Sequence, residues 1–184
     1  MTRFSTPDLA HAANVLHQGG IVAYATESCF GLGCDPTNES TVLRLLGLKQ
    51  RDVESGLILI ATAVEQLSPY VARFPRKALV TWPGPYTWLL EPTPSAPVWI
   101  TGSHARIAVR VTSHPQAAAL CRQAGISIVS TSANRGGESP AESADEVARC
   151  FGDQIDYVLP GEIGKLERPT PITDGVTGKI IRPG

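Results

Sequence analysis

Apolar residues recur every three or four positions near the start of the chain, and this spacing predicts an amphipathic helix. Thr6 precedes the pattern as a candidate cap, and two glycines at 19–20 end it. The continuous apolar run 21–25 predicts a buried strand, and the polar, glycine-containing stretch 26–38 predicts a loop. A second apolar stripe predicts another helix, which ends near Lys49.

The rest of the chain alternates between predicted strands and helices. The run 57–60 is apolar throughout, as expected of a central strand that is covered on both faces. This rhythm predicts an α/β protein with an open, twisted, mixed sheet flanked by helices. Further strands are expected at 86–90, 107–111, 127–129, 157–159 and 179–181, and further helices at 63–70, 115–124 and 144–151.

Length and composition fit one globular domain. The chain has 184 residues, of which 42% are hydrophobic and 18% charged, so it can bury one sizeable core, and we expect a single domain over 1–184. No apolar run approaches the roughly 18 residues of a membrane helix, and no signal-peptide core follows the first residues. We therefore expect a cytoplasmic protein without membrane contacts.

Several familiar enzyme signatures are missing from the sequence. Gly31 and Gly33 lack the third glycine of a dinucleotide fingerprint, whose place is taken by Pro36. There is no Walker phosphate loop, nucleophile elbow or H-E-x-x-H helix, and the four cysteines show no metal-binding spacing. We therefore expect no tightly bound organic cofactor, and we assign no metal ligand.

Polar residues gather where predicted strands end, which is where open α/β sheets tend to bind ligands. The stretch 26–33 follows the first strand, although alone it also suits an ordinary turn. The stretch 130–137 follows the strand predicted at 127–129 and holds three hydroxyls, a carboxamide and two glycines. These groups suit hydrogen bonds to phosphate or to a metal-bound water.

Two pairs of basic residues add positive charge. Lys49 and Arg51 lie just past a predicted helix and could hold polyphosphate, the lysine as a point charge and the arginine as a planar fork. Arg106 and Arg110 lie at the two ends of the strand centred on Ala108; being four residues apart, they share a face and could point at one ligand. Each pair also fits a less specific role, at a solvated helix end or on an exposed surface.

Taken together, these motifs resemble the YrdC/TsaC family of threonylcarbamoyl-AMP synthases, in its short bacterial form. The resemblance covers essentially the whole chain and implies a YrdC-like fold. Two positions depart from the family pattern: Ala25 replaces the usual proline, and Ser55 stands where relatives often carry lysine. The matching segments are 25–32 (P-T-[DE]-x-x-[YF]-G-[LV]), 49–51 (K-x-R), the apolar strand 57–60, 82–87 (W-P-G-P-x-T), 108–111 (A-V-R-V), 130–134 (S-T-S-A-N) and 182–184 (R-x-G).

The resemblance implies a nucleotidyltransferase that converts L-threonine, bicarbonate or CO2, and ATP into L-threonylcarbamoyladenylate and pyrophosphate. This product serves the threonylcarbamoyladenosine modification of tRNA. The resemblance further implies Mg2+ bound with ATP and delivery of the product to a transferase complex of TsaD, TsaB and TsaE. No covalent nucleophile is required, because the carboxylate of N-carboxylated threonine attacks the α-phosphorus of ATP directly.

The same resemblance assigns roles to individual residues. Lys49, Arg51 and Ser132 are expected to be catalytic. ATP is expected to bind to Lys49, Arg51, Ser130, Ser132, Asn134 and Arg182, and L-threonine to Thr26, Arg110 and Thr131.

An alternative is a module that binds double-stranded RNA or tRNA without catalysis. The family resemblance allows it, because a concave basic surface could accept an RNA duplex. The net charge of −1 and the lack of aromatic residues interleaved on a basic strand count against it.

Overall fold

Helices and strands alternate along residues 5–184, the part of the chain that this computed structural model describes. The α-helices are α1 (Thr6–His17), α2 (Glu39–Leu48), α3 (Arg76–Leu79), α4 (Val98–Thr101), α5 (Pro115–Ala124) and α6 (Ala144–Phe151). The 3-10 helices are η1 (Val53–Ser55), η2 (Val64–Gln66) and η3 (Gly152–Gln154). The strands are β1 (Val22–Ala25), β2 (Phe30–Gly33), β3 (Ile58–Ala61), β4 (Thr87–Leu90), β5 (Ile107–Val111), β6 (Ile128–Ser132), β7 (Tyr157–Val158), β8 (Ile172–Asp174) and β9 (Ile180–Arg182).

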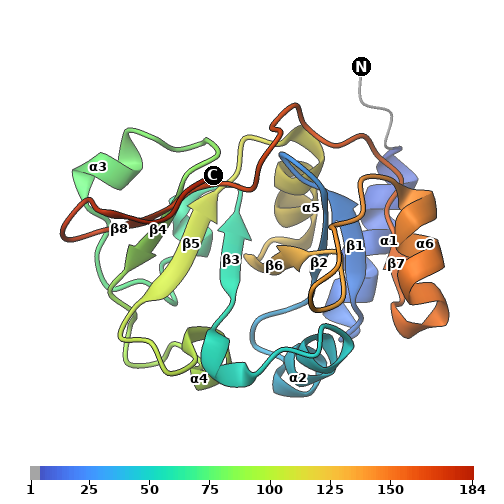
Figure 1. The fold of residues 1–184 in the computed structure, drawn as a ribbon, viewed down its shortest axis with the longest axis horizontal. Coiled ribbons are helices and arrows are strands. Elements are labelled where there is room, and N and C mark those ends of the chain that lie inside the picture. Colours follow the sequence, from blue (N-terminus) through green and yellow to red (C-terminus); the bar gives the residue numbers. More distant parts are fainter. Residues whose placement is uncertain (1–4) are drawn as a thin grey trace.

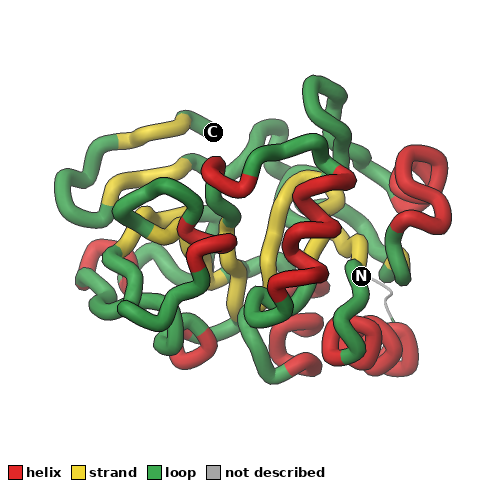
Figure 2. Tube along the Cα trace, turned by 90° about the horizontal axis from the view of Figure 1, so that it is seen from below, coloured by secondary structure: helices red, strands yellow, loops and turns green. Residues whose placement is uncertain are grey.

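One mixed sheet connects all of these strands, and helices flank it (Figure 1). The strand order is β7-β1-β2-β6-β3-β5-β4-β8-β9. β3 pairs in parallel with β5 on one side and antiparallel with β6 on the other. The β8–β9 hairpin lies beside β4 and ends at the carboxyl terminus (Figure 2). The predicted mixed α/β sheet is therefore confirmed.

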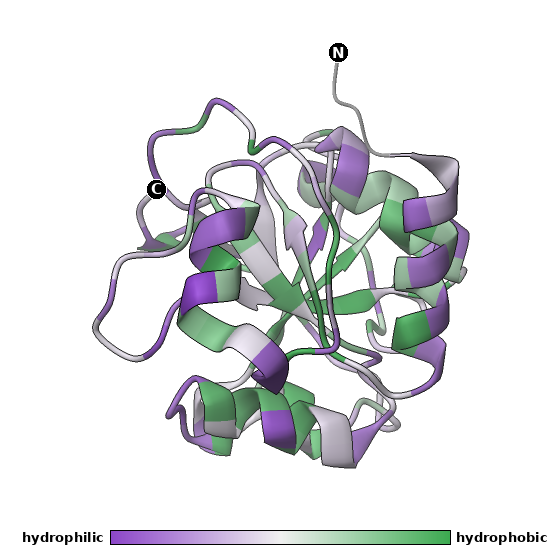
Figure 3. Ribbon diagram, turned by 90° about the vertical axis from the view of Figure 1, so that its right-hand side faces the viewer, coloured by the Kyte–Doolittle hydropathy of each residue, from purple (hydrophilic) through white to green (hydrophobic). Residues whose placement is uncertain are grey.

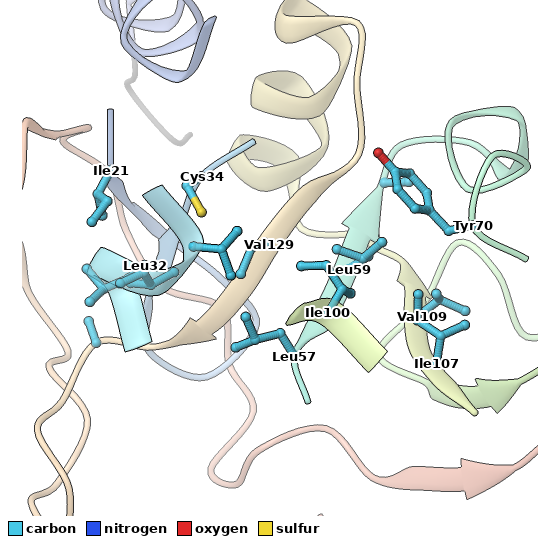
Figure 4. Packing of buried hydrophobic residues seen from close by; sticks show 14 of the residues in the cluster. Ile21, Leu32, Cys34, Leu57, Leu59, Tyr70, Ile100, Ile107, Val109 and Val129 are labelled. Carbon is cyan, nitrogen blue, oxygen red and sulfur yellow. The ribbon is translucent and has the colours of Figure 1, made fainter. Parts of the chain in front are cut away.

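The core forms on both faces of this sheet. On one face, Leu59, Val109 and Val129 belong to a large cluster that also contains residues of α2, α4 and α6 (Figure 4). On the other face, Ile60 and Ile128 pack with α1 and α5. The helices in Figure 3 carry both hydrophilic and hydrophobic residues, as expected of helices with one side against a sheet and the other in water.

The first helix begins with a different cap from the one expected. Ser5, not Thr6, is the cap: its Oγ accepts a hydrogen bond from the Asp8 backbone N–H at 3.2 Å. The Asp8 carboxylate in turn accepts from the Ser5 N–H at 3.4 Å, which completes a capping box. The prediction failed because Ser5 and Thr6 are both good caps, and only Ser5 has an acidic residue three positions later.

Ser5→Ala is expected to lower the free energy of unfolding by about 1 kcal/mol, because it leaves amide groups at the start of α1 without a partner. Thr6→Ala is the matched control and is expected to change this free energy by less than about 0.5 kcal/mol. Urea denaturation of both variants measures the difference. A larger loss in the Thr6 variant would contradict the observed cap.

A strand lies inside the stretch 26–38, which was expected to be a loop. β2 was missed because two of its four residues are glycines, which give no strand-like alternation. Gly33 is required by close packing: a Cβ there would lie 2.5 Å from the Val129 carbonyl oxygen and 2.9 Å from the Tyr24 ring. A hydrophobic pattern alone does not reveal a strand in which close contacts with neighbouring residues require glycine.

Other boundaries also differ from expectation. The segment 63–70 forms only the short η2 and turns, since Pro69 cannot donate the backbone hydrogen bond that a longer helix needs. β6 continues to Ser132, so the hydroxyl-rich residues form the second half of the strand instead of a loop after it. The short elements α3, α4 and β8 were not predicted. The strand at 107–111 and the helix at 115–124 have the expected boundaries.

Candidate active site

A cavity of about 540 Å³ opens on the face of the sheet that carries Ala108 and Arg110. Alternation along β5 sends Val109 into the core and these two residues toward the cavity. Leu89, Ala108, Ile58 and Ser130 are register partners across four adjacent strands, and all four line the cavity. The remaining walls come from segments 26–31, 51–57, 100–106, 131–132, 169–172 and 181–182, with Pro140.

Most of the predicted site residues line this one cavity. They are Thr26, Arg51, Arg110, Ser130, Thr131, Ser132 and Arg182. Lys49 and Asn134 do not line it but contact the residues that do. Folding thus brings together stretches from the start, middle and end of the chain.

The Lys49 ammonium anchors the end of β6 from behind the cavity wall. Its Nζ donates to the Ser132 carbonyl oxygen at 2.5 Å, to the Asn134 carbonyl oxygen at 2.8 Å and to Asn134 Oδ1 at 3.1 Å. Burial, and next the charge of Arg51, lower the pKa of Lys49 to about 8. The lysine therefore acts on the structure of the 132–134 segment and contributes its charge at short range.

The Asn134 side chain fixes the same segment through all of its polar atoms. Its Oδ1 also accepts from Ser132 Oγ at 2.6 Å. Its Nδ2 donates to the Arg135 carbonyl oxygen at 3.0 Å and to the Glu138 carbonyl oxygen at 2.8 Å. The hydroxyl and backbone groups of Ser132 are thereby held in place at the cavity wall.

Two arginines bring positive charge to the cavity without a carboxylate partner among residues 5–184. Arg51 Nη2 donates to the Gly56 carbonyl oxygen at 2.7 Å, and Arg182 Nη2 donates to the Thr170 carbonyl oxygen at 3.1 Å. Partial removal from water lowers the pKa of both guanidinium groups, and the charges of Arg110 and Arg51 lower that of Arg182 further. Both groups keep free N–H donors for an anionic ligand.

Arg110 forms a buried ion pair with Glu27, at 3.1 Å between Nη2 and Oε2. The pair is enclosed by hydroxyls: Thr112 Oγ1 donates to Glu27 Oε1 at 2.6 Å, and Arg110 Nη1 donates to Thr170 Oγ1 at 2.8 Å and Thr87 Oγ1 at 3.1 Å. Sequence reasoning singled out the stretch that contains Glu27 but not this residue. The only acidic side chain in the stretch 26–33 was the available signal.

The other candidate groups have structural partners. Arg106 lines the cavity and bonds Asp174 at 2.5 Å, and this pair ties the start of β5 to the end of β8. His114 caps α5, and burial lowers its pKa. Within residues 5–184, no group of three or more His, Cys, Asp or Glu side chains is placed to hold a metal ion. In the same part of the chain, no helix combines the length and the apolar character that crossing a membrane requires.

The fold and the cavity define a class: an α/β protein with an arginine-rich pocket that suits a small anionic ligand. The Sua5/YciO/YrdC family model, described as "Telomere recombination", matches residues 14–184. The chain belongs to this family, which confirms the resemblance found in the sequence.

Named relatives support the same assignment. The chain is 52% identical over 176 residues to "Threonylcarbamoyl-AMP synthase" of Halorhodospira halophila, covering 94% of this chain and 92% of the relative. It is 52% identical over 172 residues to the protein of the same name in Alkalilimnicola ehrlichii, covering 91% and 90%. Its fold matches a crystal structure of P. abyssi Sua5 complexed with L-threonine, with a TM-score of 0.87 and 30% identity, over 94% of this chain. This chain spans about half of that Sua5 chain, 52%.

Proposed function

We infer that this chain acts as a threonylcarbamoyl-AMP synthase, a nucleotidyltransferase with ATP and L-threonine as substrates. The observation that carries this inference is one cavity that gathers Arg51, Ser132 and Arg182 on one hand and Thr26 and Arg110 on the other. The names of the close relatives agree with it. The names favour the synthase over an RNA-binding module without catalysis.

We propose bicarbonate, or CO2 derived from it, as the third substrate. The amine nitrogen of L-threonine bonds to the carbon of CO2 and releases a proton, which gives an N-carboxylate. An oxygen of this carboxylate then bonds to the α-phosphorus of ATP, and the bond from that phosphorus to the bridging oxygen of the β-phosphate breaks. Pyrophosphate leaves, so the protein must mainly align these groups and offset the repulsion between anions.

The arginines without carboxylate partners suit the triphosphate. Arg51 and Arg182 neutralise it, and the Ser130 hydroxyl donates a hydrogen bond to it. The Ser132 hydroxyl donates to Asn134 Oδ1 in the structure and reaches the triphosphate by turning away from that oxygen. Lys49 adds positive charge and, with Asn134, fixes the segment that carries Ser132. L-Threonine binds in this proposal to Thr26, Arg110 and Thr131.

Mg2+ enters this proposal together with ATP, and no organic cofactor is needed. The serine hydroxyls of β6 suit hydrogen bonds to waters of a hard cation, which prefers oxygen and keeps part of its hydration shell. We place the reaction in the cytoplasm, where ATP and bicarbonate are both available. The labile acyl adenylate is passed on to TsaD, TsaB and TsaE, and tRNA enters as the later acceptor.

Pyrophosphate release tests the proposed function. The purified protein is incubated with ATP, Mg2+, L-threonine and bicarbonate, and each component is omitted in turn. Release is expected only in the complete mixture. Equal release without L-threonine would show an ATP pyrophosphohydrolase instead and would contradict the synthase.

The pKa of Lys49 predicts an alkaline limit to this activity. Below pH 8 the side chain is an ammonium with three N–H donors for its three acceptors; above pH 8 it is a neutral amine with only two. We expect kcat/KM for ATP, at saturating L-threonine, to fall as the pH rises through about 8. A profile that stays flat to pH 10, measured by pyrophosphate release, would contradict this role.

A further inference from the structure

Most of the charged side chains that line the cavity are positive. Four arginines contribute to the lining, at positions 51, 106, 110 and 182, whereas Glu27 is the one acidic residue among the described residues there. L-Threonine enters as a zwitterion, with an ammonium that the arginines repel. A cation desolvated in such a pocket needs an anionic partner. In this lining, that partner can only be Glu27.

Glu27 is held ready for such a role. It is 6% exposed, lines the cavity and is fixed at its backbone, where its carbonyl oxygen accepts from the Leu166 N–H at 3.1 Å. Each carboxylate oxygen accepts one hydrogen bond, from Thr112 or from Arg110. Because a carboxylate offers about four acceptor sites, each oxygen keeps capacity for another donor.

Arg110 supplies the complementary group next to this carboxylate. Its Nη1 is occupied by Thr87 and Thr170, and Nη2 bonds Glu27. Its Nε, in a side chain that is 6% exposed, has no hydrogen-bond partner among residues 5–184. A buried N–H without an acceptor is unfavourable unless a ligand supplies one. The ion pair thus holds the Glu27 carboxylate in a fixed position at the cavity.

We propose that Glu27, held in place by its ion pair with Arg110, binds the α-ammonium of L-threonine. This inference rests on the proposed function and specifies how its amino-acid substrate is recognised. The Glu27–Arg110 pair carries no net charge, and neither does the zwitterion, so the two match without leaving a charge uncompensated. Glu27 therefore selects α-amino acids against hydroxy acids of the same shape.

A comparison of L-threonine with 3-hydroxybutanoate tests this selection, since that compound keeps the carboxylate, the hydroxyl and the methyl group but lacks the amine. In titration calorimetry the wild-type protein is expected to bind L-threonine at least about tenfold more tightly. In Glu27→Gln the ratio of the two affinities is expected to fall to about one. Binding of a non-hydrolysable ATP analogue is expected to stay within about twofold of wild type, which shows that the variant is folded.

Two further variants serve as controls. Glu27→Asp keeps the carboxylate and is expected to retain part of the preference. Arg44→Gln removes a surface ion pair with Asp156 and is expected to leave the preference unchanged.

Three results would overturn the inference: equal affinity of the wild type for both compounds, an unchanged preference in Glu27→Gln, or as complete a loss in Glu27→Asp. The first needs no variant at all, so it applies even if the substitutions prevent folding. Failure of the proposed function looks different. In that case the wild type binds no L-threonine and releases no pyrophosphate that depends on L-threonine.

Discussion

Lys49→Ala is expected to lower kcat/KM for ATP about a hundredfold. The change removes a positive charge near the proposed phosphate site and leaves three acceptors of Ser132 and Asn134 without their common donor. Loss of charge-assisted hydrogen bonds worth about 2–3 kcal/mol corresponds to roughly 30- to 150-fold in rate. Steady-state pyrophosphate release at varied ATP concentration measures the effect.

Lys77→Ala provides the matched control for Lys49→Ala. Lys77 also donates to a backbone carbonyl, but its acceptor Val176 does not line the cavity, whereas Lys49 bonds the lining residue Ser132. Its replacement is expected to leave kcat/KM within about twofold of wild type. A Lys49 variant with the same small effect would show that the 132–134 segment holds its shape without the ammonium.

Arg110→Ala is expected to have the largest effect on stability, lowering the free energy of unfolding by about 3–5 kcal/mol. The substitution leaves Glu27 as a buried charge without its cation and removes the donor shared by Thr87 and Thr170. Guanidinium chloride denaturation, followed by circular dichroism, measures the loss.

Two further variants test whether the unpaired buried charge of Glu27 causes the loss of stability in Arg110→Ala. Arg106→Ala removes an ion pair that is less buried, with side chains 31% and 14% exposed, and is expected to lower stability by only about 1 kcal/mol. The double variant Glu27→Gln with Arg110→Met removes both charges and is expected to be more stable than Arg110→Ala alone. A loss below about 1 kcal/mol in Arg110→Ala would contradict the buried pair.

The hydrophobic pattern of the sequence predicted those helices and strands in which apolar residues recur at regular spacing. The strand at 107–111 and the helix at 115–124 were found with their boundaries, because burial on regular faces determines both. β2 was missed because two of its four residues are glycines; close approach to Val129 and Tyr24 requires one of them, Gly33, and this packing is not visible along the chain. The hydrophobic pattern therefore predicts an element only where burial of regularly spaced residues determines that element.

The site was predictable as a set of segments but not as a geometry. The family resemblance implied that 49–51 and 130–134 lie together, and the hydrogen bonds of Lys49 join them. The sequence did not show that this ammonium lies behind the cavity wall, because that depends on where α2 ends relative to β6. Nor did it show the ion pair of Glu27, since its partner Arg110 lies on another strand, 83 residues away.

A crystal structure with a non-hydrolysable ATP analogue and L-threonine tests the central claim most directly, namely that distant segments build one cavity for both substrates. The account predicts both ligands in this cavity, with the triphosphate against Arg51, Ser132 and Arg182 and the threonine ammonium at Glu27. A nucleotide bound elsewhere on the protein, with the cavity left to solvent, would contradict it.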